Sequence, residues 1–109
     1  TDGAYFRYTH AVSGGNWQAV TRSAGAETAS NSGVAVAAAT NYALDIQSDA
    51  AGNVFFYIDS TLVATHTTNI PTGAGRETCY GMVIVKSAGT AARLHQTDYA
   101  MVEQSFSGR

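Results

Sequence analysis

Residues 42–66 alternate apolar and polar side chains, and two short turn-forming segments interrupt the alternation. In a β-strand, every second side chain points to the same face, so this period of two predicts three consecutive antiparallel strands with one face buried. The first turn, residues 49–53, contains a glycine, and the second is the dipeptide Asp59-Ser60. The pattern predicts an antiparallel β architecture: Leu44 and Ile46 alternate with Asp45 and Gln47, and Val54, Phe56 and Ile58 alternate with Phe55 and Tyr57.

The rest of the chain predicts further short strands separated by glycine-rich and polar turns. No linker or repeat divides the sequence, so we expect one domain covering residues 1–109 with about seven to nine strands, which is typical of a β-sandwich or jelly roll. The short run at residues 27–29 is expected to end at residues 30–33, and residues 34–40 are expected to form a strand end and a connection. The other predicted strands are residues 4–10, 17–22, 42–48, 53–58, 61–67, 79–86 and 92–104.

The composition of the chain argues against several classes of function. Charged residues make up 13% of the chain, about half the usual share for a globular domain. The six basic residues are scattered along the sequence, which argues against a nucleic-acid partner because phosphate binding needs clustered cations. No apolar run is long enough to span a membrane. Cys79 has no second cysteine to pair with, and we interpret it as a small buried hydrophobic residue.

Several segments together resemble a concanavalin A-like (laminin-G-like) jelly-roll domain of the kind found in bacteriophage structural and tail-associated proteins. The resemblance extends over nearly the whole chain and implies an all-β, antiparallel β-sandwich with a jelly-roll topology. It also implies a location in a virion or outside the cell. The segments that carry it are residues 3–8, 16–22, 42–46, 55–59, 69–71, 91–93 and 98–99.

This chain departs from that family in length and at two local positions. Asn41 stands where an aromatic residue often precedes Tyr42, and the hairpin turn reads Asp59-Ser60 where Asp-Gly is usual. Jelly rolls of this type carry additional strands before the point where this chain starts, so the resemblance implies a partial or N-terminally truncated sandwich. Because uncovered strand edges favour association, we expect self-association or a missing segment supplied by another chain.

Trp17, Tyr5 and Tyr57 are the candidate glycan-binding residues, because flat aromatic rings stack on the C–H faces of sugars. The alternative is ordinary packing within and between sheets, which the shared face of Trp17 and Ala19 favours.

The sequence contains no pattern that predicts a metal-binding or catalytic site. Asp45, Asp49 and Asp59 lie near predicted hairpin ends, but calcium needs six or more converging oxygen ligands, so we interpret them as turn residues. The three histidines lack metal-ligand spacing. The sequence also lacks the alternating Glu-X-Asp-X-Glu run with which jelly-roll glucanases cleave glycans, and it lacks a Gly-X-Ser-X-Gly motif. We therefore expect no catalytic residues, no cofactor and no enzymatic activity.

The leading hypothesis is a non-enzymatic structural module of a virion, such as a capsid decoration, fibre or tail domain. Such a module would act by associating with copies of itself or with another virion protein. The alternative hypothesis is a carbohydrate-binding module that recognises a cell-surface glycan.

Overall fold

The computed structural model describes residues 2–72, 81 and 96–103. The chain divides into two compact units, Thr1–Gly73 and Ala74–Arg109. The described part of the first unit is all-β apart from one short 3₁₀ turn, η1 (Ser13–Gly15). This confirms the predicted all-β class.

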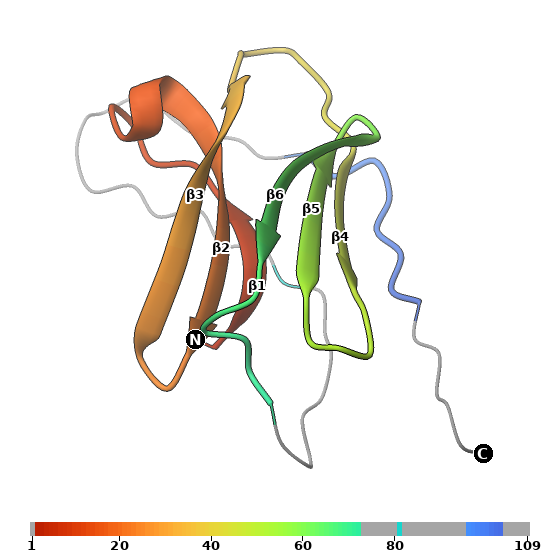
Figure 1. Ribbon diagram of the computed structural model, residues 1–109. Helices are drawn as coiled ribbons and strands as arrows, with labels where there is room; N and C mark the ends of the chain where they lie inside the picture. The colour runs from red at the N-terminus through yellow and green to blue at the C-terminus, as the bar shows by residue number, and fades with distance from the viewer. Residues whose placement is uncertain (1, 73–80, 82–95, 104–109) are drawn as a thin grey trace. The chain divides into compact units, whose positions relative to one another are not determined.

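The first unit contains two three-stranded antiparallel sheets (Figure 1). Sheet A has the order β1-β2-β3 and sheet B the order β4-β5-β6. Both sheets are simple meanders, as expected where short turns join consecutive strands. The strands are β1 (Gly3–Arg7), β2 (Asn16–Ser23), β3 (Ala26–Ala35), β4 (Leu44–Ser48), β5 (Val54–Ile58) and β6 (Thr61–His66).

The two sheets face each other, with β3 next to β6 and β1 next to β4. Phe56 of β5 is fully buried in the core between them, where it packs with Ala19 of β2 and Val54 of β5. Phe6 and Ile70 are partly buried against this cluster. Val54, Phe56 and Ile58 are all buried, so this alternating set, and not Phe55 and Tyr57, forms the inward face of β5.

The third strand differs from the prediction, because β3 continues through residues 30–33 and ends at Ala35. Asn16 pairs with Ala35, whereas Gln18 pairs with Asn31, so β3 carries extra residues that form a bulge. Gly33 lies in this bulge with a φ of +74°, and its N–H donates to Asn31 Oδ1. The polar run that suggested a turn is thus a glycine-containing bulge within a continuous strand.

In the second unit, the described residues 96–103 form neither helix nor strand. The predicted strand over residues 92–104 is therefore wrong for this part of its length. The predicted strand over residues 79–86 lies outside the described residues except for Gly81, which is not in a strand.

Candidate functional site

A group of polar side chains lies inside the first unit, where β2 and β3 of sheet A approach β6 of sheet B. His66, at the end of β6, is at its centre and is only 3% exposed. Thr21 Oγ1 lies 3.0 Å from His66 Nδ1, and Ser30 Oγ lies 2.9 Å from His66 Nε2. We call this group the inter-sheet polar cluster; its members are Thr21, Thr28, Ser30, His66, Thr68 and Asn69.

The hydrogen bonds of the cluster determine where the imidazole proton sits. Thr21 Oγ1 donates its only hydrogen to the carbonyl oxygen of Thr68, at 2.9 Å. The same oxygen must therefore accept from His66, which places the ring hydrogen on Nδ1. His66 Nε2 is then an acceptor, and the hydroxyl of Ser30 donates to it.

The cluster extends from this imidazole to the chain that follows β6. The Thr28 and Thr68 hydroxyls lie 2.8 Å apart, and Asn69 Nδ2 donates to Thr28 Oγ1 at 2.9 Å. These bonds hold residues 67–70 against β3. Because buried polar groups are costly when unpaired, the fully bonded His66 fixes the position of one sheet relative to the other.

A serine that donates to a histidine nitrogen also resembles the nucleophile and base of a hydrolase. In such enzymes a carboxylate on the other side of the imidazole stabilises the positive charge that develops there. Here that position is taken by the neutral hydroxyl of Thr21, and burial lowers the pKa of His66 below its ordinary value of 6.5. Both features oppose proton uptake, so we interpret the Ser30–His66 pair as structural.

The outward face of sheet A carries a second network, built around an ion pair. Arg7 of β1 and Glu27 of β3 form two contacts, with Nη2–Oε1 at 2.9 Å and Nη1–Oε2 at 3.1 Å. Arg7 Nε also donates to Gln18 Oε1, and the hydroxyl of Tyr5 donates to Glu27 Oε2 at 3.3 Å. Hydrogen bonds from Arg7 lower the pKa of Glu27 below its ordinary value of 4.5.

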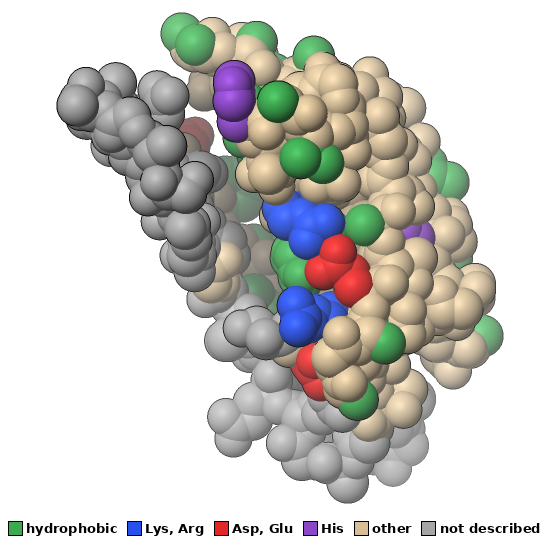
Figure 2. Space-filling model, turned by 90° about the vertical axis from the view of Figure 1, so that its left-hand side faces the viewer, with side chains coloured by type: hydrophobic (Ala, Val, Ile, Leu, Met, Phe, Trp, Pro, Cys, Tyr) green, Lys and Arg blue, Asp and Glu red, His purple; other side chains and the backbone are tan. Residues whose placement is uncertain are grey.

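The strand register explains why these residues meet. Arg7 pairs with Gln18, and Arg22 pairs with Glu27, so all four belong to the same face of sheet A. Figure 2 shows basic and acidic side chains alternating in one strip on the surface it draws. The alternation of sign means that this strip is not a patch of one charge, which fits the absence of clustered cations in the sequence.

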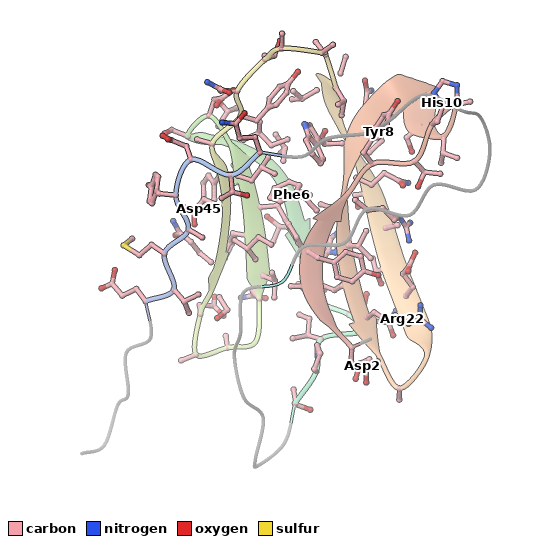
Figure 3. All side chains as sticks on the ribbon, turned by 180° about the vertical axis from the view of Figure 1, so that it is seen from behind. Asp2, Phe6, Tyr8, His10, Arg22 and Asp45 are labelled. Carbon is pink, nitrogen blue, oxygen red and sulfur yellow. The ribbon has the colours of Figure 1, made fainter. Side chains whose placement is uncertain are left out.

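Trp17 lies among other aromatic rings near the β3–β4 connection. Its ring meets Tyr42 edge-on at a centroid distance of 5.8 Å, Phe6 at 6.4 Å and Tyr8 at 6.5 Å. Tyr42 also holds the β3–β4 connection in place, because its hydroxyl donates a hydrogen bond to the carbonyl oxygen of Ala35. Figure 3 shows Phe6 pointing from β1 into the space between the sheets, with Tyr8 further toward one end.

The three glycan-binding candidates lie at three separate places. Tyr5 is on the outward face of sheet A, bonded to Glu27. Trp17 packs in the aromatic group just described. Tyr57 pairs with Asp45 and Leu62, and it alternates with the buried Phe56, which places it on the outward face of sheet B. The structure does not bring them together into one binding surface.

The three aspartates named as calcium candidates each serve a local hydrogen bond. Asp59 Oδ1 accepts from the backbone N–H of Ala43, and Asp49 Oδ1 accepts from that of Asn53. Asp45 Oδ2 accepts from a side-chain amide two residues along β4. In the described ranges, no three His, Cys, Asp or Glu side chains are grouped closely enough to hold a metal ion.

Two apolar residues of β4 lie on the inward face of sheet B and are nevertheless exposed. Leu44 pairs with Ile58 and Ile46 pairs with Phe56, so both share the face of the core. Yet Leu44 is 39% exposed and Ile46 is 37% exposed. Within the part of the chain that the structure describes, β4 pairs only with β5. Among the described residues, this edge of sheet B therefore combines backbone groups without a strand partner with partly exposed core residues.

The family described as "SO2946-like, C-terminal domain" matches residues 1–98. The chain belongs to this family. No curated protein and no solved structure matches the chain at a significant level. In the described part of this SO2946-like domain, no helix is long and apolar enough to cross a membrane.

Sequence reasoning missed the main feature of this SO2946-like domain, the inter-sheet polar cluster. The spacing of the histidines predicts no metal site and no motif supports a Ser-His-Asp arrangement, so His66 was assigned no role. Only part of the signal was present in the sequence: alternation places Thr21 on the face of Ala19, whereas a regular hairpin at Asp59-Ser60 would pair Val54 with Thr65. The irregularity between Phe56 and Tyr57 shifts the register, so that His66 pairs with Val54 on the buried face. Polar residues at core positions indicate a buried hydrogen-bond network.

Proposed function

We propose that this domain is a non-enzymatic structural module of a virion, such as a capsid decoration, fibre or tail domain, that acts by associating with copies of itself or with a larger particle. The single observation that carries this proposal is the uncovered inward face of β4 at Leu44 and Ile46. Covering apolar surface and pairing a free strand edge both favour association.

The architecture supports a finer fold proposal as well. Two antiparallel sheets that face each other are the basic arrangement of a concanavalin A-like jelly roll, and the sequence resembles bacteriophage members of that class. We propose that the two three-stranded sheets are part of a larger sandwich, in which further strands extend sheet B beyond β4. A second copy of the chain is the occupant that we favour, because two β4 edges can pair with each other across a twofold axis.

The proposed location, in a virion or outside the cell, rests on composition and on the resemblance. A surface with few charged residues and many threonine and serine residues suits a protein that functions within an assembly. The glycan-binding alternative receives less support from the geometry, because Tyr5, Trp17 and Tyr57 do not converge and the Trp17 ring already packs against three aromatic neighbours.

Light scattering coupled to size-exclusion chromatography tests the proposal on the full 109-residue chain. We expect the wild-type chain to form a dimer or higher oligomer at micromolar concentration, and the double variant Leu44→Thr/Ile46→Thr to be a monomer. The matched control is Leu62→Thr, because Leu62 is 50% exposed on β6, outside this surface. It should leave the oligomer intact.

A monomeric wild-type chain at tens of micromolar would exclude self-association, and loss of the oligomer in the Leu62→Thr control would exclude the β4 surface. A glycan array run in parallel separates the alternative function. Saturable binding of one glycan class by a monomeric chain, together with a change in Trp17 fluorescence, would replace the structural proposal by the carbohydrate-binding one.

A further inference from the structure

The inter-sheet polar cluster has a property that neither the family nor the proposed function assigns. Its central imidazole is buried, and its two ring nitrogens contact only hydroxyl groups, those of Thr21 and Ser30. Histidine is the side chain whose ordinary pKa allows it to gain a charge near neutral pH. A buried histidine without a carboxylate partner is therefore sensitive to mild acid.

Among the residues that the structure describes, those around His66 offer no compensating charge. The elements packed against it are β2, β3, β5 and residues 67–70. The charged residues of β2 and β3 are Arg22 and Glu27, which lie opposite each other in the strand register on the outward face of sheet A, where Glu27 forms its ion pair with Arg7. Tyr57, the titratable residue of β5, points to the outward face of sheet B, and residues 67–70 contain no titratable side chain.

The more distant acidic groups are also engaged elsewhere. Asp49, in the turn before β5, is bonded to Asn53, and these bonds lower its pKa below its ordinary value of 3.8. Asp45 belongs to the outward face of β4 and bonds to Gln47. In the described residues, no carboxylate is placed to stabilise an imidazolium at position 66.

Protonation would not by itself break the hydrogen bonds of the cluster. The Ser30 hydroxyl can rotate and accept from a protonated Nε2, and Thr21 already accepts from Nδ1. The cost instead arises from burying a net charge among uncharged groups, the hydroxyls of Thr21 and Ser30 and the ring of Phe56, whose centroid lies 5.1 Å from that of the imidazole. Because the cluster joins β2 and β3 to β6, this unfavourable free energy weakens the contact between the two sheets.

We infer that His66 is a pH-sensitive lock between the two sheets, closed when the imidazole is neutral and released when it binds a proton in mild acid. The sign follows from linkage: burial lowers the pKa of His66 in the folded state below 6.5, so the unfolded state binds more protons. The stability that the neutral imidazole contributes is complete above about pH 6.5 and is lost as the pH falls from there toward the lower folded-state pKa. The inference does not depend on the proposed self-association.

The test uses the full chain with His10→Gln and His95→Gln, so that His66 is the only histidine. Urea unfolding is followed by Trp17 fluorescence from about pH 8 to about pH 5, a range that lies above the pKa values of Glu27 and Asp49. We expect the folding equilibrium constant to be constant above neutral pH and then to fall by up to about tenfold per pH unit, the limit for one proton. The matched control adds His66→Gln to the same background, and its equilibrium constant should not change across this range.

Two outcomes of the unfolding experiment would overturn the inference: a flat profile for the chain that retains His66, or the same acid-induced fall in the chain that lacks it. If the His66→Gln variant does not fold, an NMR titration of the chain with His66 as its only histidine decides the question. A titration midpoint below 6.5, accompanied by shifts of the Thr21, Ser30 and Thr68 amide signals, supports the lock. A midpoint at or above 6.5, or no change at these amides, refutes it.

Discussion

Phe6 of β1 and Phe56 of β5 meet edge to face, with ring centroids 5.4 Å apart and an angle of 86° between the ring planes. The contact joins the central strand of sheet B to an edge strand of sheet A. Because edge-to-face pairs add to the stabilisation from apolar burial, this pair contributes strongly to the contact between the sheets. It also continues into the aromatic group around Trp17, which Phe6 contacts from its other side.

Phe56→Ala should strongly destabilise the first unit. The side chain is fully buried, and truncation of a buried phenylalanine to alanine typically costs about 3–5 kcal/mol of unfolding free energy. Urea unfolding followed by Trp17 fluorescence measures this change. Phe55→Ala is the matched control, because Phe55 points to the outward face of β5 and is only half-buried. Equal losses in the two variants would contradict the assignment of the core to the inward face.

The alternation of residues 54–58 was sufficient to predict two distinct sides of β5, but not which side is buried or what covers it. A period of two separates the Phe56 face from the Phe55 face, since only local geometry is involved. The partner of Phe56 is Phe6, fifty positions earlier in the chain and in the other sheet. Strand patterns contain no information on which sheet packs on which, so this contact required the structure.

The bulge in β3 is a second feature that the sequence alone does not predict. Residues 30–33 have the composition of a turn, and the strand before them was expected to end there. In the structure, Asn31 accepts hydrogen bonds from Asn16 and from the N–H of Gly33, while the strand continues to Ala35. The same residue types serve turns and bulges, because both need a positive φ and local side-chain hydrogen bonds. Local composition therefore indicates an irregular segment but does not distinguish a turn from a bulge.

The β5–β6 turn at Asp59-Ser60 should tolerate, and gain from, a glycine. Both residues have positive φ, 49° for Asp59 and 65° for Ser60, which is the conformation of a type I′ hairpin turn. A residue with a Cβ is strained at this φ, so we expect Ser60→Gly to raise the free energy of unfolding by about 0.5–1 kcal/mol. Thermal or urea unfolding measures the gain.

Gly52→Ala, in the β4–β5 turn, is the opposite control for Ser60→Gly. Gly52 has a φ of 86°, and an added Cβ would meet no atom within 4 Å, so the substitution tests backbone strain alone. It should lower stability by an amount similar to the gain in Ser60→Gly. If Ser60→Gly is destabilising, the hydroxyl of Ser60 makes a contribution that the turn geometry does not account for.

The Arg7–Glu27 pair should make a small, pH-dependent contribution to stability. The two side chains are 33% and 27% exposed, so solvent screening limits the pair to about 0.2–1 kcal/mol. Glu27 has a lowered pKa in the folded state, so its contribution is present above its ordinary value of 4.5 and is lost as the pH falls below it. A double-mutant cycle with Arg7→Met and Glu27→Gln should show coupling at neutral pH that weakens as the pH falls below 4.5. Coupling that persists in acid would mean that the contact is not ionic.

The tautomer of His66 is the sharpest prediction of the inter-sheet geometry. Because Thr21 donates to the carbonyl of Thr68, the neutral imidazole must carry its hydrogen on Nδ1. Long-range proton–nitrogen NMR spectra at mildly alkaline pH should show this form. Thr21→Val removes the acceptor, so the hydrogen should move to Nε2, where the oxygen of Ser30 can accept it. Thr21→Ser keeps the hydroxyl and should retain the Nδ1–H form. Observation of the Nε2–H form in the wild-type chain, or no change of tautomer in Thr21→Val, would mean that the Thr21 hydroxyl does not set the direction of these bonds.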